Sequence, residues 1–395
     1  MKFSELNLPS SILEALNKMG FKELTPVQEA TYPVIKEGKD LCALAETGSG
    51  KTSACAIPLV QKIDPNHNAV QALVIVPTRE LCIQFVEEIH QIAIRTPIEP
   101  FAVYGGFDKS IQATKIKHGA HILVATPGRL MDLMYDGIVE LGDIKCVILD
   151  EADRLLDEGF LEDIEFILSC IRHPHQTLLF SATMDDKTKK LIDEGLSNPV
   201  HISLISKRAT PKSLEHYFTL VTRQTKDKVF LDYLQKEKIR QAIIFCNTRR
   251  GVNKLHQAVR KKVRDAEYIH SGLDQGKRSS IVRRFRAKRI RYLIATDVAG
   301  RGLDFSHVSH IINYDFPHIE QYTHRTGRTG RMGRKGCAFS LVTKRDLPTV
   351  RKVVQTTKIT PHWFGPDPLN EPPAPPEKRQ SRRSPRNRRP RRPRH

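Results

Sequence analysis

The chain has 395 residues, more than one domain usually holds, and 39% of them are apolar, which is enough to build real cores. Its net charge is +20 with an isoelectric point near 9.7, which favours an anionic partner, nucleic acid before an anionic membrane. No apolar run reaches 18 residues and no apolar signal-peptide core stands near Met1, so neither a transmembrane helix nor export is expected.

Short apolar runs alternate with amphipathic segments from residue 40 onward. Several runs lack the period-2 alternation of half-exposed strands, as expected for strands buried on both faces of a parallel sheet. Helical segments such as 79–93 lie between them, which predicts βαβ units and an α/β fold. The predicted strands are 40–45, 72–77, 122–126, 146–150 and 177–181 in the first half, and 242–247, 268–270, 292–296, 310–315 and 338–343 in the second.

The polar stretch 205–213 is the best candidate linker between the two halves. We therefore expect two tandem RecA-like parallel-sheet domains, 1–206 and 214–365, with a cleft between them, followed by a disordered basic tail at 366–395. Residues 371–395 hold nine Arg and one Lys against two Glu, with seven prolines and no large apolar residue. A merely solubilising terminus is the alternative, but a bias toward arginine favours phosphate contacts.

Seven cysteines are scattered along the chain, and no two lie within four residues of each other, so there is no CxxC zinc pair. Most stand in apolar runs, which predicts buried reduced thiols. Reduced thiols are typical of a reducing cytosol, so a cytoplasmic location is expected.

The segment AETGSGKT (45–52) follows a predicted strand and precedes a predicted helix. It fits the P-loop pattern, with an alanine in place of the usual first glycine. In such a loop backbone N–H groups cradle phosphates, the lysine reaches the β- and γ-phosphates, and the hydroxyl after it holds Mg²⁺. A plain Gly-rich turn is the alternative. The predicted ATP-binding residues here are Ala45, Glu46, Thr47, Gly48, Ser49, Gly50, Lys51 and Thr52.

The segment DEAD (150–153) follows a predicted buried strand, where carboxylates face the ligand crevice of a parallel sheet. Asp150 fits the Walker-B role on Mg²⁺, and Glu151 is placed to orient or deprotonate a water molecule. An acidic helix N-terminus is the alternative. The hydroxyls of Ser181 and Thr183 either bond Asp153, linking nucleotide state to movement, or cap a helix, and the spacing alone does not choose.

Taken together, the motifs over about residues 1–345 resemble those of the DEAD-box ATP-dependent RNA helicases. GFKELTPVQ (20–28), with Phe3 upstream, is similar to that family's Q motif. The resemblance implies that Thr25 belongs to the ATP site, that Phe21 stacks on the adenine and that Gln28 reads its edge. A side-chain amide can match the N6 donor and N7 acceptor of adenine. Taken alone, Gln28 would be an ordinary residue early in a helix.

Six further segments resemble the motifs through which this family contacts RNA. Hydroxyls, backbone N–H groups and arginines suit phosphate and ribose contacts, which fix register without reading sequence. In ATDVAGRGLD (295–304) the resemblance assigns Asp304 to the nucleotide ribose, and Gly300 stands where alanine is commoner, which would loosen the loop. The RNA-binding residues implied are Thr78, Arg79, Gly106, Thr126, Gly128, Arg129, Thr248, Gly272 and Thr296.

The segment HRTGRTGRMGR (324–334) places an arginine at every third position and resembles the family's motif VI, with Thr326 where an aliphatic residue is commoner. The resemblance implies that Arg328 and Arg331 reach the phosphates from the second domain and that His324 couples the two sites. Arg325 is expected to link this segment to neighbouring motifs. A loose Gly/Arg tract that grips RNA is the alternative, and Arg334 is expected to be a surface charge.

The resemblance implies an ATP-dependent RNA helicase that uses ATP and Mg²⁺ and contacts RNA without sequence preference. RNA-stimulated hydrolysis would close the two domains and open short duplexes, with the tail as an extra RNA anchor. A monomer without membrane contact is expected. An ATP-gated RNA clamp that rarely unwinds and a DNA-directed superfamily-2 ATPase are the alternatives. The sequence identifies neither the RNA nor any ribosomal or RNA-decay partner.

Overall fold

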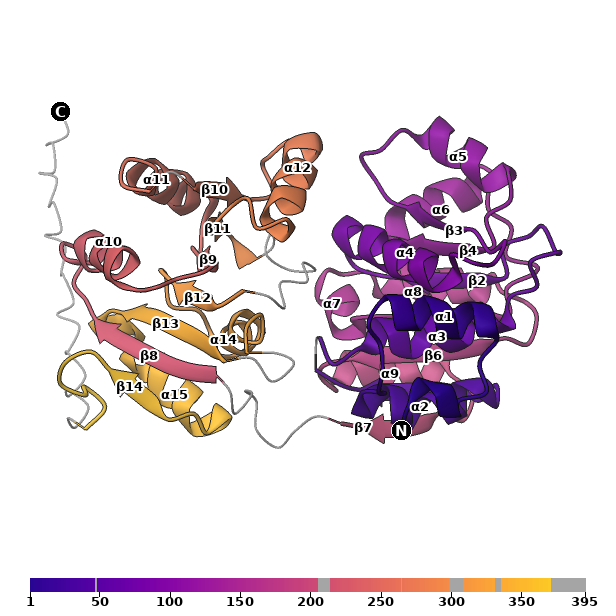
Figure 1. Cartoon of the computed structure of the whole chain (residues 1–395), viewed down its shortest axis with the longest axis horizontal. Coiled ribbons are helices and arrows are strands. Elements are labelled where there is room, and N and C mark those ends of the chain that lie inside the picture. Colours follow the sequence, from indigo (N-terminus) through magenta and orange to yellow (C-terminus); the bar gives the residue numbers. More distant parts are fainter. Residues whose placement is uncertain (47, 205–213, 264, 298–307, 331–334, 371–395) are drawn as a thin grey trace, which may run out of the picture.

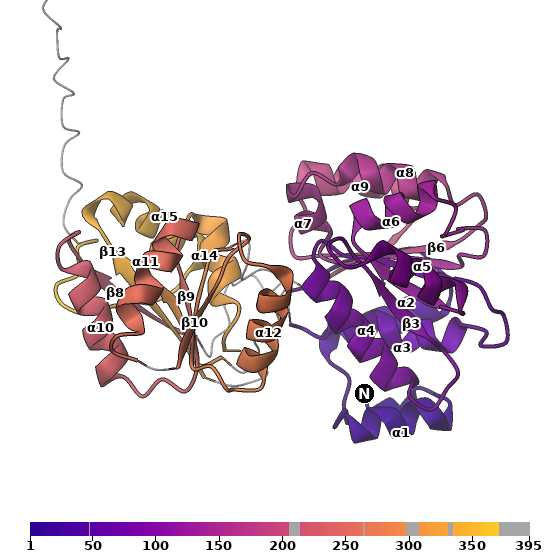
Figure 2. The same cartoon turned by 90° about the horizontal axis from the view of Figure 1, so that it is seen from above.

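The computed structural model describes residues 1–370 except 47, 205–213, 264, 298–307 and 331–334. These residues form two α/β units side by side, each built on a seven-stranded sheet (Figures 1 and 2). The first sheet contains β1 (Leu41–Leu44), β2 (Ala72–Ile75), β3 (Pro100–Val103), β4 (Ile122–Ala125), β5 (Cys146–Leu149), β6 (Gln176–Ser181) and β7 (Val200–Ser203). The second contains β8 (Leu214–Leu220), β9 (Ala242–Phe245), β10 (Ala266–Ile269), β11 (Tyr292–Ala295), β12 (His310–Asn313), β13 (Gly336–Val342) and β14 (Pro361–Trp363).

Helices cover both faces of each sheet. In the first unit they are η1 (Phe3–Glu5), α1 (Ser10–Lys18), α2 (Pro26–Lys36), α3 (Lys51–Lys62), α4 (Arg79–Ala93), α5 (Lys109–Lys117), α6 (Pro127–Tyr135), α7 (Ala152–Asp157), α8 (Leu161–Ser169) and α9 (Asp186–Gly195). In the second they are α10 (Lys226–Lys236), α11 (Arg249–Val259), α12 (Gln275–Arg286), α14 (Ile319–Thr326), η2 (Lys344–Asp346) and α15 (Leu347–Thr357).

All strand pairs of the two sheets are parallel, and the two sheets have the same topology. The first runs β3-β4-β2-β5-β6-β1-β7 and the second β10-β11-β9-β12-β13-β8-β14. Numbered within its own unit, each sheet therefore has the order 3-4-2-5-6-1-7. Because parallel strands end at a common edge, the loops after these strands gather there in both units.

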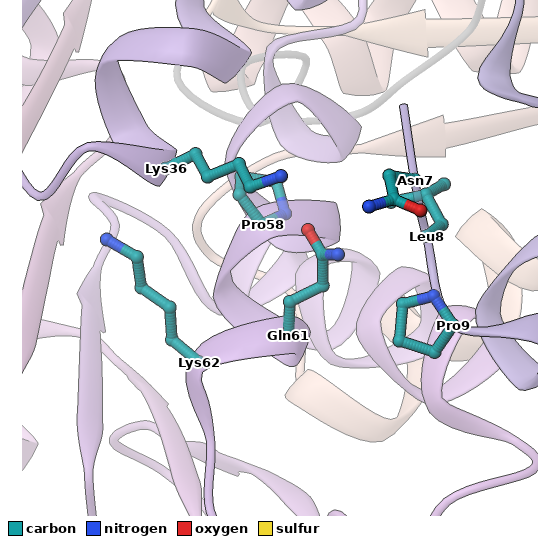
Figure 3. A pocket seen from close by; sticks show the side chains of 7 residues that line it. All are labelled: Asn7, Leu8, Pro9, Lys36, Pro58, Gln61 and Lys62. Carbon is teal, nitrogen blue, oxygen red and sulfur yellow. The ribbon is translucent and has the colours of Figure 1, made fainter. Parts of the chain in front are cut away.

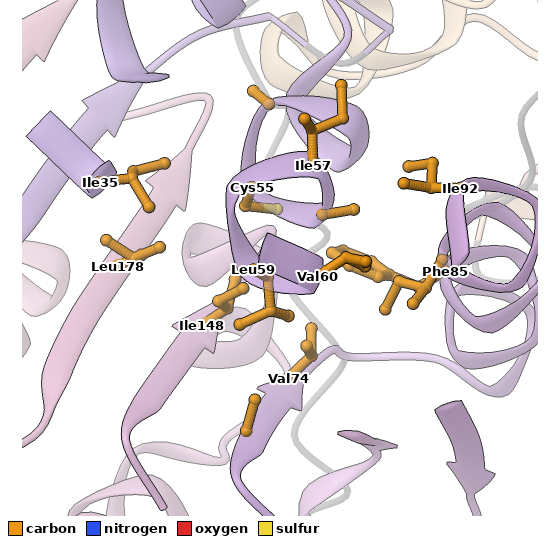
Figure 4. Close-up of a cluster of buried hydrophobic side chains, with 14 of the residues drawn as sticks. Ile35, Cys55, Ile57, Leu59, Val60, Val74, Phe85, Ile92, Ile148 and Leu178 are labelled. Atoms are coloured by element: carbon orange, nitrogen blue, oxygen red, sulfur yellow. The ribbon is translucent and has the colours of Figure 1, made fainter. Parts of the chain in front are cut away.

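Burial of apolar side chains on both faces fixes the central strands. Residues of β2, β4 and β5 are all buried, as the uninterrupted apolar runs predict. On one face of the first sheet, Leu59 and Val60 of α3 pack over Val74, Ile148 and the neighbouring strands (Figure 4). Each such side chain contributes roughly 1.5–3 kcal/mol when fully buried. The strand ends that carry the motifs therefore rest on a rigid core.

The ten predicted strands are confirmed to within a few residues, whereas β3, β7, β8 and β14 went unpredicted. Three of these are edge strands, where apolar runs are short. β7 alternates half-buried and exposed residues, and both β3 and β14 begin with proline, which a sheet tolerates at its edge. The α/β prediction with two parallel sheets is confirmed. The predicted linker 205–213 and residues 371–395 of the tail lie outside the described residues.

The cysteines are buried as predicted for five positions: Cys42, Cys55, Cys82, Cys146 and Cys246. Burial raises the pKa of the Cys42 thiol to about 11 and that of Cys146 to about 12, which keeps both protonated and unreactive. Among the described residues, no helix combines the length and the apolar character needed to cross a bilayer.

Candidate ATP and RNA sites

The P-loop joins β1 to α3 and turns on a glycine. Gly50 precedes the helix with a φ of 97°, and a Cβ there would lie 3.0 Å from both Gln28 Nε2 and Thr25 Oγ1. Any larger residue would thus be strained by its backbone and crowded by its neighbours. Lys51 begins α3, is buried, and donates from Nζ to the Ala45 carbonyl at 2.9 Å. The structure therefore places the predicted lysine across the mouth of the loop.

The Q-motif segment packs directly on this loop, a contact that spacing alone did not indicate. The buried Gln28 side chain accepts from the Thr25 N–H at 2.8 Å and donates to the Gly50 carbonyl at 3.4 Å. An amide oxygen and an amide nitrogen each have capacity for a second hydrogen bond, so the adenine contact predicted for Gln28 remains available. Phe21 stacks on Phe3 with ring centroids 6.1 Å apart.

Two buried hydroxyls beside the loop have no hydrogen-bond partner within the described residues, Thr25 Oγ1 and Ser49 Oγ. Most buried polar atoms in proteins are paired, so unpaired ones indicate where a ligand supplies the bond. Both belong to the predicted ATP site. Thr47 lies outside the described residues.

Asp150 ends β5 beside the P-loop and has 4% of its surface exposed. Burial raises the pKa of its carboxyl, while the ammonium of Lys51 lowers it. A cation nearby would offset the cost of keeping this buried carboxylate charged. The described residues hold no group of three or more His, Cys, Asp or Glu suited to a metal. Asp150 and Thr52 fit Mg²⁺, which takes few protein oxygens and completes its shell with phosphates and water.

Glu151 adopts a left-handed backbone conformation, with φ 53° and ψ 49°. Such a conformation is uncommon for a residue other than glycine and marks a position held by its surroundings. Its carboxylate pairs with the Arg154 guanidinium one helical turn on, and both side chains are buried. The sequence analysis did not single out Arg154, although the i,i+3 spacing of opposite charges was visible.

The segment after β6 contacts the DEAD segment. Thr183 Oγ1 donates to Asp153 Oδ2 at 3.1 Å, and the Ala182 N–H donates to the same oxygen at 3.2 Å. Ser181 Oγ accepts from the Asp153 N–H at 3.3 Å. Of the two sequence interpretations, the bond to Asp153 is the one present, and the coupling role assigned to it stays a prediction.

In the first unit the predicted RNA residues lie after β2, β3 and β4. Thr78 caps α4 by accepting from the Leu81 N–H at 3.3 Å. Gly106 has a φ of 75°, and a Cβ there would lie 2.5 Å from the Arg79 guanidinium. The glycine doublet thus makes room for this arginine. Thr126 precedes α6, Gly128 is open to solvent, and Arg129 donates to the Phe107 carbonyl at 2.9 Å.

In the second unit they lie after β9, β10 and β11. Thr248 caps α11 through the Gly251 N–H at 3.0 Å, in the same manner as Thr78 caps α4. The Gly272 N–H donates to His270 Nδ1 at 3.1 Å. Thr296 Oγ1 is buried without a hydrogen-bond partner in the described part of the chain.

The order of the strands separates these two sets of residues. The predicted ATP and coupling residues of the first unit follow β1, β5 and β6, on one side of the sheet, and the predicted RNA residues follow β3, β4 and β2, on the other. In the second unit the predicted RNA residues follow β10, β11 and β9, the topologically equivalent strands. Each sheet thus gathers its predicted RNA residues in the same half.

The motif VI segment runs from α14 into the loop after it. Arg325 is buried and bonds Asp297 at 2.5 Å, Asn247 Oδ1 at 3.0 Å and Asn313 Oδ1 at 3.2 Å, which confirms that it links neighbouring motifs. Thr326 is fully buried, and its hydroxyl donates to the Tyr322 carbonyl, so this departure from the family leaves no unpaired polar group. Two further positions are described: Arg328 is buried and His324 is partly exposed. Asp304, Gly300, Arg331 and Arg334 lie outside the described residues.

Two ion pairs join the units through α4 and α12, which face each other in Figure 2. Arg278 Nε lies 2.7 Å from Glu80, and both side chains are largely buried. Arg286 lies 3.6 Å from Glu87 in a more exposed contact. Glu80 directly follows the predicted RNA residues Thr78 and Arg79. This contact depends on the tertiary arrangement and was not foreseen.

A cavity of about 540 Å³ lies away from the predicted site residues, at the C-terminal ends of α2 and α3 (Figure 3). Lys36, Pro58, Gln61 and Lys62 line it, together with Asn7, Leu8 and Pro9. The Lys62 ammonium bonds the Ile35 carbonyl and Gln176, so it is engaged in holding the fold. Two helix C-termini also disfavour an anion here.

Residues 25–191 match the DEAD/DEAH box helicase family, and residues 225–333 match the helicase conserved C-terminal domain. The chain is 43% identical over 358 residues to the ATP-dependent RNA helicase CshA of Listeria monocytogenes, covering 90% of this chain and 69% of that protein. It is 40% identical to the DEAD-box ATP-dependent RNA helicase CshA of Geobacillus kaustophilus, covering 93% and 79%.

Among solved structures, S. cerevisiae Dbp5 bound to RNA and ADP BeF3 superimposes with a TM-score of 0.83 at 27% identity, covering 92% of this chain and 95% of that one. A DEAD box protein from Methanococcus jannaschii gives 0.56 at 34% identity, covering 92% and 99%. The fold and the strand-end residues define a two-domain, RecA-like P-loop helicase. The chain belongs to the DEAD-box family of ATP-dependent RNA helicases, enzymes that hydrolyse ATP and act on RNA.

Proposed function

We propose that this helicase couples ATP hydrolysis at the ends of β1, β5 and β6 to RNA held across the equivalent halves of both sheets. The observation that carries the proposal is the strand order, which places the two sets of residues in separate halves of the first sheet yet on one continuous edge. The bond between Asp153 and Thr183 lies on the ATP side of this edge. We propose residues 1–206 and 214–365 as the two domains.

The residues of the ATP side divide the work. Gln28 and Phe21 orient the base, the P-loop amides and Lys51 hold the phosphates, and Thr52 and Asp150 would hold Mg²⁺. When bound, this ion neutralises charge on the phosphate oxygens. Glu151, positioned by Arg154, orients the attacking water and accepts its proton. Arg328 and Arg331 supply the remaining positive charge from the second domain.

On the RNA side, hydroxyls, glycine N–H groups and arginines of both domains contact the sugar-phosphate backbone without reading bases. Domain closure then strains the bound strand and opens a short duplex locally. The tail is proposed as an additional RNA anchor, and the protein as a cytoplasmic monomer.

The deciding experiment compares RNA and DNA of equal sequence as stimulators of ATP turnover, and follows strand displacement on a short RNA duplex. We expect stimulation by RNA alone and displacement that requires ATP. Equal stimulation by DNA would favour a DNA-directed enzyme, and stimulated turnover without displacement would favour an RNA clamp.

The outer ion pair between the domains offers a test of closure. Glu87→Arg places like charges opposite each other, and we expect the RNA concentration for half-maximal ATPase to rise roughly two- to fivefold, since exposed pairs contribute about 0.2–1 kcal/mol. The double variant Glu87→Arg/Arg286→Glu should restore it. Because Glu87→Arg adds a positive charge, an effect on RNA attraction alone would instead tighten binding, and that outcome would exclude the pair as a closing contact.

A further inference from the structure

The net charge of the chain is concentrated in two segments, and one of them is folded. Residues 249–291 contain fifteen Lys and Arg against three Asp and Glu, a net charge of +12. Residues 371–395 carry +8, so these two segments together account for the whole +20 and the rest of the chain is neutral. The segment 249–291 includes α11, β10 and α12 of the second domain.

These elements wrap one edge of the second sheet. β10 is the edge strand, α11 packs on one face through Val252, Leu255 and Val259, and α12 packs on the other through Ile281 and Phe285. Figures 1 and 2 place both helices beside β10. The outward sides of the two helices and the turns after them therefore form a surface that runs around the β10 edge, here called the basic edge.

Part of the positive charge is already engaged. Arg278 and Arg286 pair with the first domain, Arg284 pairs with Glu267 at 2.9 Å, and Arg291 donates to the Ile239 carbonyl. Ten others are exposed and have no carboxylate within 4.0 Å among the described residues. These are Arg249, Arg250, Lys254, Arg260, Lys261, Lys262, Lys277, Arg283, Lys288 and Arg289.

A surface of this kind repels itself in the absence of a partner. Like charges one turn apart destabilise a helix, and the neutral balance of the remaining chain shows that solvation does not require such an excess. A polyanion removes the repulsion and gains entropy from released counterions. The basic edge is also continuous with the predicted RNA residues, because a Cβ on Gly272 would lie 3.7 Å from the Arg249 guanidinium.

The chemistry of the basic edge favours a duplex over a single strand. Single-strand sites combine basic grooves with exposed aromatic rings on which bases stack. The large hydrophobic side chains exposed in the described chain include none from 249–291. Two paired backbones present phosphates on a broad surface and hide their bases, which suits lysines and arginines spread over two helices.

We propose that the basic edge binds the phosphates of an RNA duplex that flanks the strand held between the domains. This second RNA site goes beyond the proposed function, since it uses none of the residues assigned there to ATP or to the held strand. It would keep the enzyme beside the duplex that it opens, and would give affinity for junctions over bare single strands.

The test uses the full chain with Lys261→Gln, Lys262→Gln, Arg283→Gln and Arg289→Gln combined. The control variant carries Lys236→Gln, Lys238→Gln, Lys344→Gln and Lys352→Gln, four exposed lysines of the same domain away from the basic edge. Each protein is titrated with a single-stranded RNA and with the same strand extended by a duplex, over a range of salt concentrations.

For the duplex-flanked RNA we expect the edge variant to bind about tenfold or more weakly at 0.1 M salt. Its log–log salt slope should shrink by up to about 3 to 4, at about 0.9 per lost contact. Single-strand affinity and saturating ATP turnover should stay as in the control variant, which also shows that the fold is intact. An unchanged preference for the duplex-flanked RNA would overturn the proposal and leave an acidic protein surface as the occupant. An equal loss on both RNAs would overturn it too, whereas failure of the function itself would abolish RNA-stimulated turnover in the unmodified chain.

Discussion

Replacing Arg328 with alanine is expected to lower RNA-stimulated ATP turnover by about 10³–10⁵-fold, the contribution of an arginine that meets the developing charge on a transferred phosphoryl group. Arg328 follows α14 in a buried position, beside a segment fixed by the bonds of Arg325 to Asp297 and Asn247. The first domain supplies Lys51 as its cation, so the second domain must provide any other. Single-turnover hydrolysis at saturating RNA and ATP is the measurement, because it isolates the chemical step.

The matched control for this variant is Arg345→Ala, an exposed arginine of η2 in the same domain, which should leave turnover unchanged. RNA affinity of the Arg328→Ala protein in the absence of nucleotide should also be unchanged. Turnover near that of the unmodified chain would remove Arg328 from the reaction and return the repeat at 324–334 to its other interpretation, a tract that grips RNA.

The second large effect is expected from Lys51→Gln, which keeps most of the side-chain length and removes the charge. Removing one preorganised electrostatic group from such a site lowers turnover by about 10²–10³-fold. ATP affinity should fall as well, since the lysine contacts the phosphates in both the ground state and the transition state. Lys51→Arg should fall almost as far, because the guanidinium fork cannot replace an ammonium that already donates to the Ala45 carbonyl within a tight loop.

Lys36→Gln provides the control, since that lysine is exposed at the end of α2, away from the P-loop. The readouts are kcat and KM for ATP at saturating RNA. A Lys51→Gln protein that loses ATP affinity but keeps kcat would mean that the lysine binds both states equally and does not stabilise the transition state.

How much of this molecule was predictable depends on how local each feature is. Strands such as β2 and β5 announce themselves because burial on both faces requires four consecutive apolar residues. β14 does not, because three residues led by Pro361 carry little signal at a sheet edge. The residues of the predicted site were found through motifs that lie within a few positions of a strand end.

The contacts that tie those motifs together are long-range, and no local pattern reports them. Gln28 bonds Gly50 across 22 positions, and Arg278 meets Glu80 across the domain boundary. The pair between Glu151 and Arg154 was local enough to be visible, but neither its burial nor the left-handed backbone of Glu151 follows from composition. Tertiary packing decides both.

The shared strand order indicates that the two domains descend from one duplicated ancestor, and the copies have diverged unequally. Thr78 and Thr248 still begin equivalent helices with backbone angles that agree within a few degrees. In the second copy, the segment after β8 (VTRQTKDK, 221–228) contains no glycine, so the ancestral phosphate loop is gone there. The molecule thus has two like grips on one polynucleotide but a single engine. With both grips facing the strand in the same sense, the spacing between the phosphates they hold is set by how the domains abut, so any shift of one domain against the other is imposed on the RNA as a change of pitch.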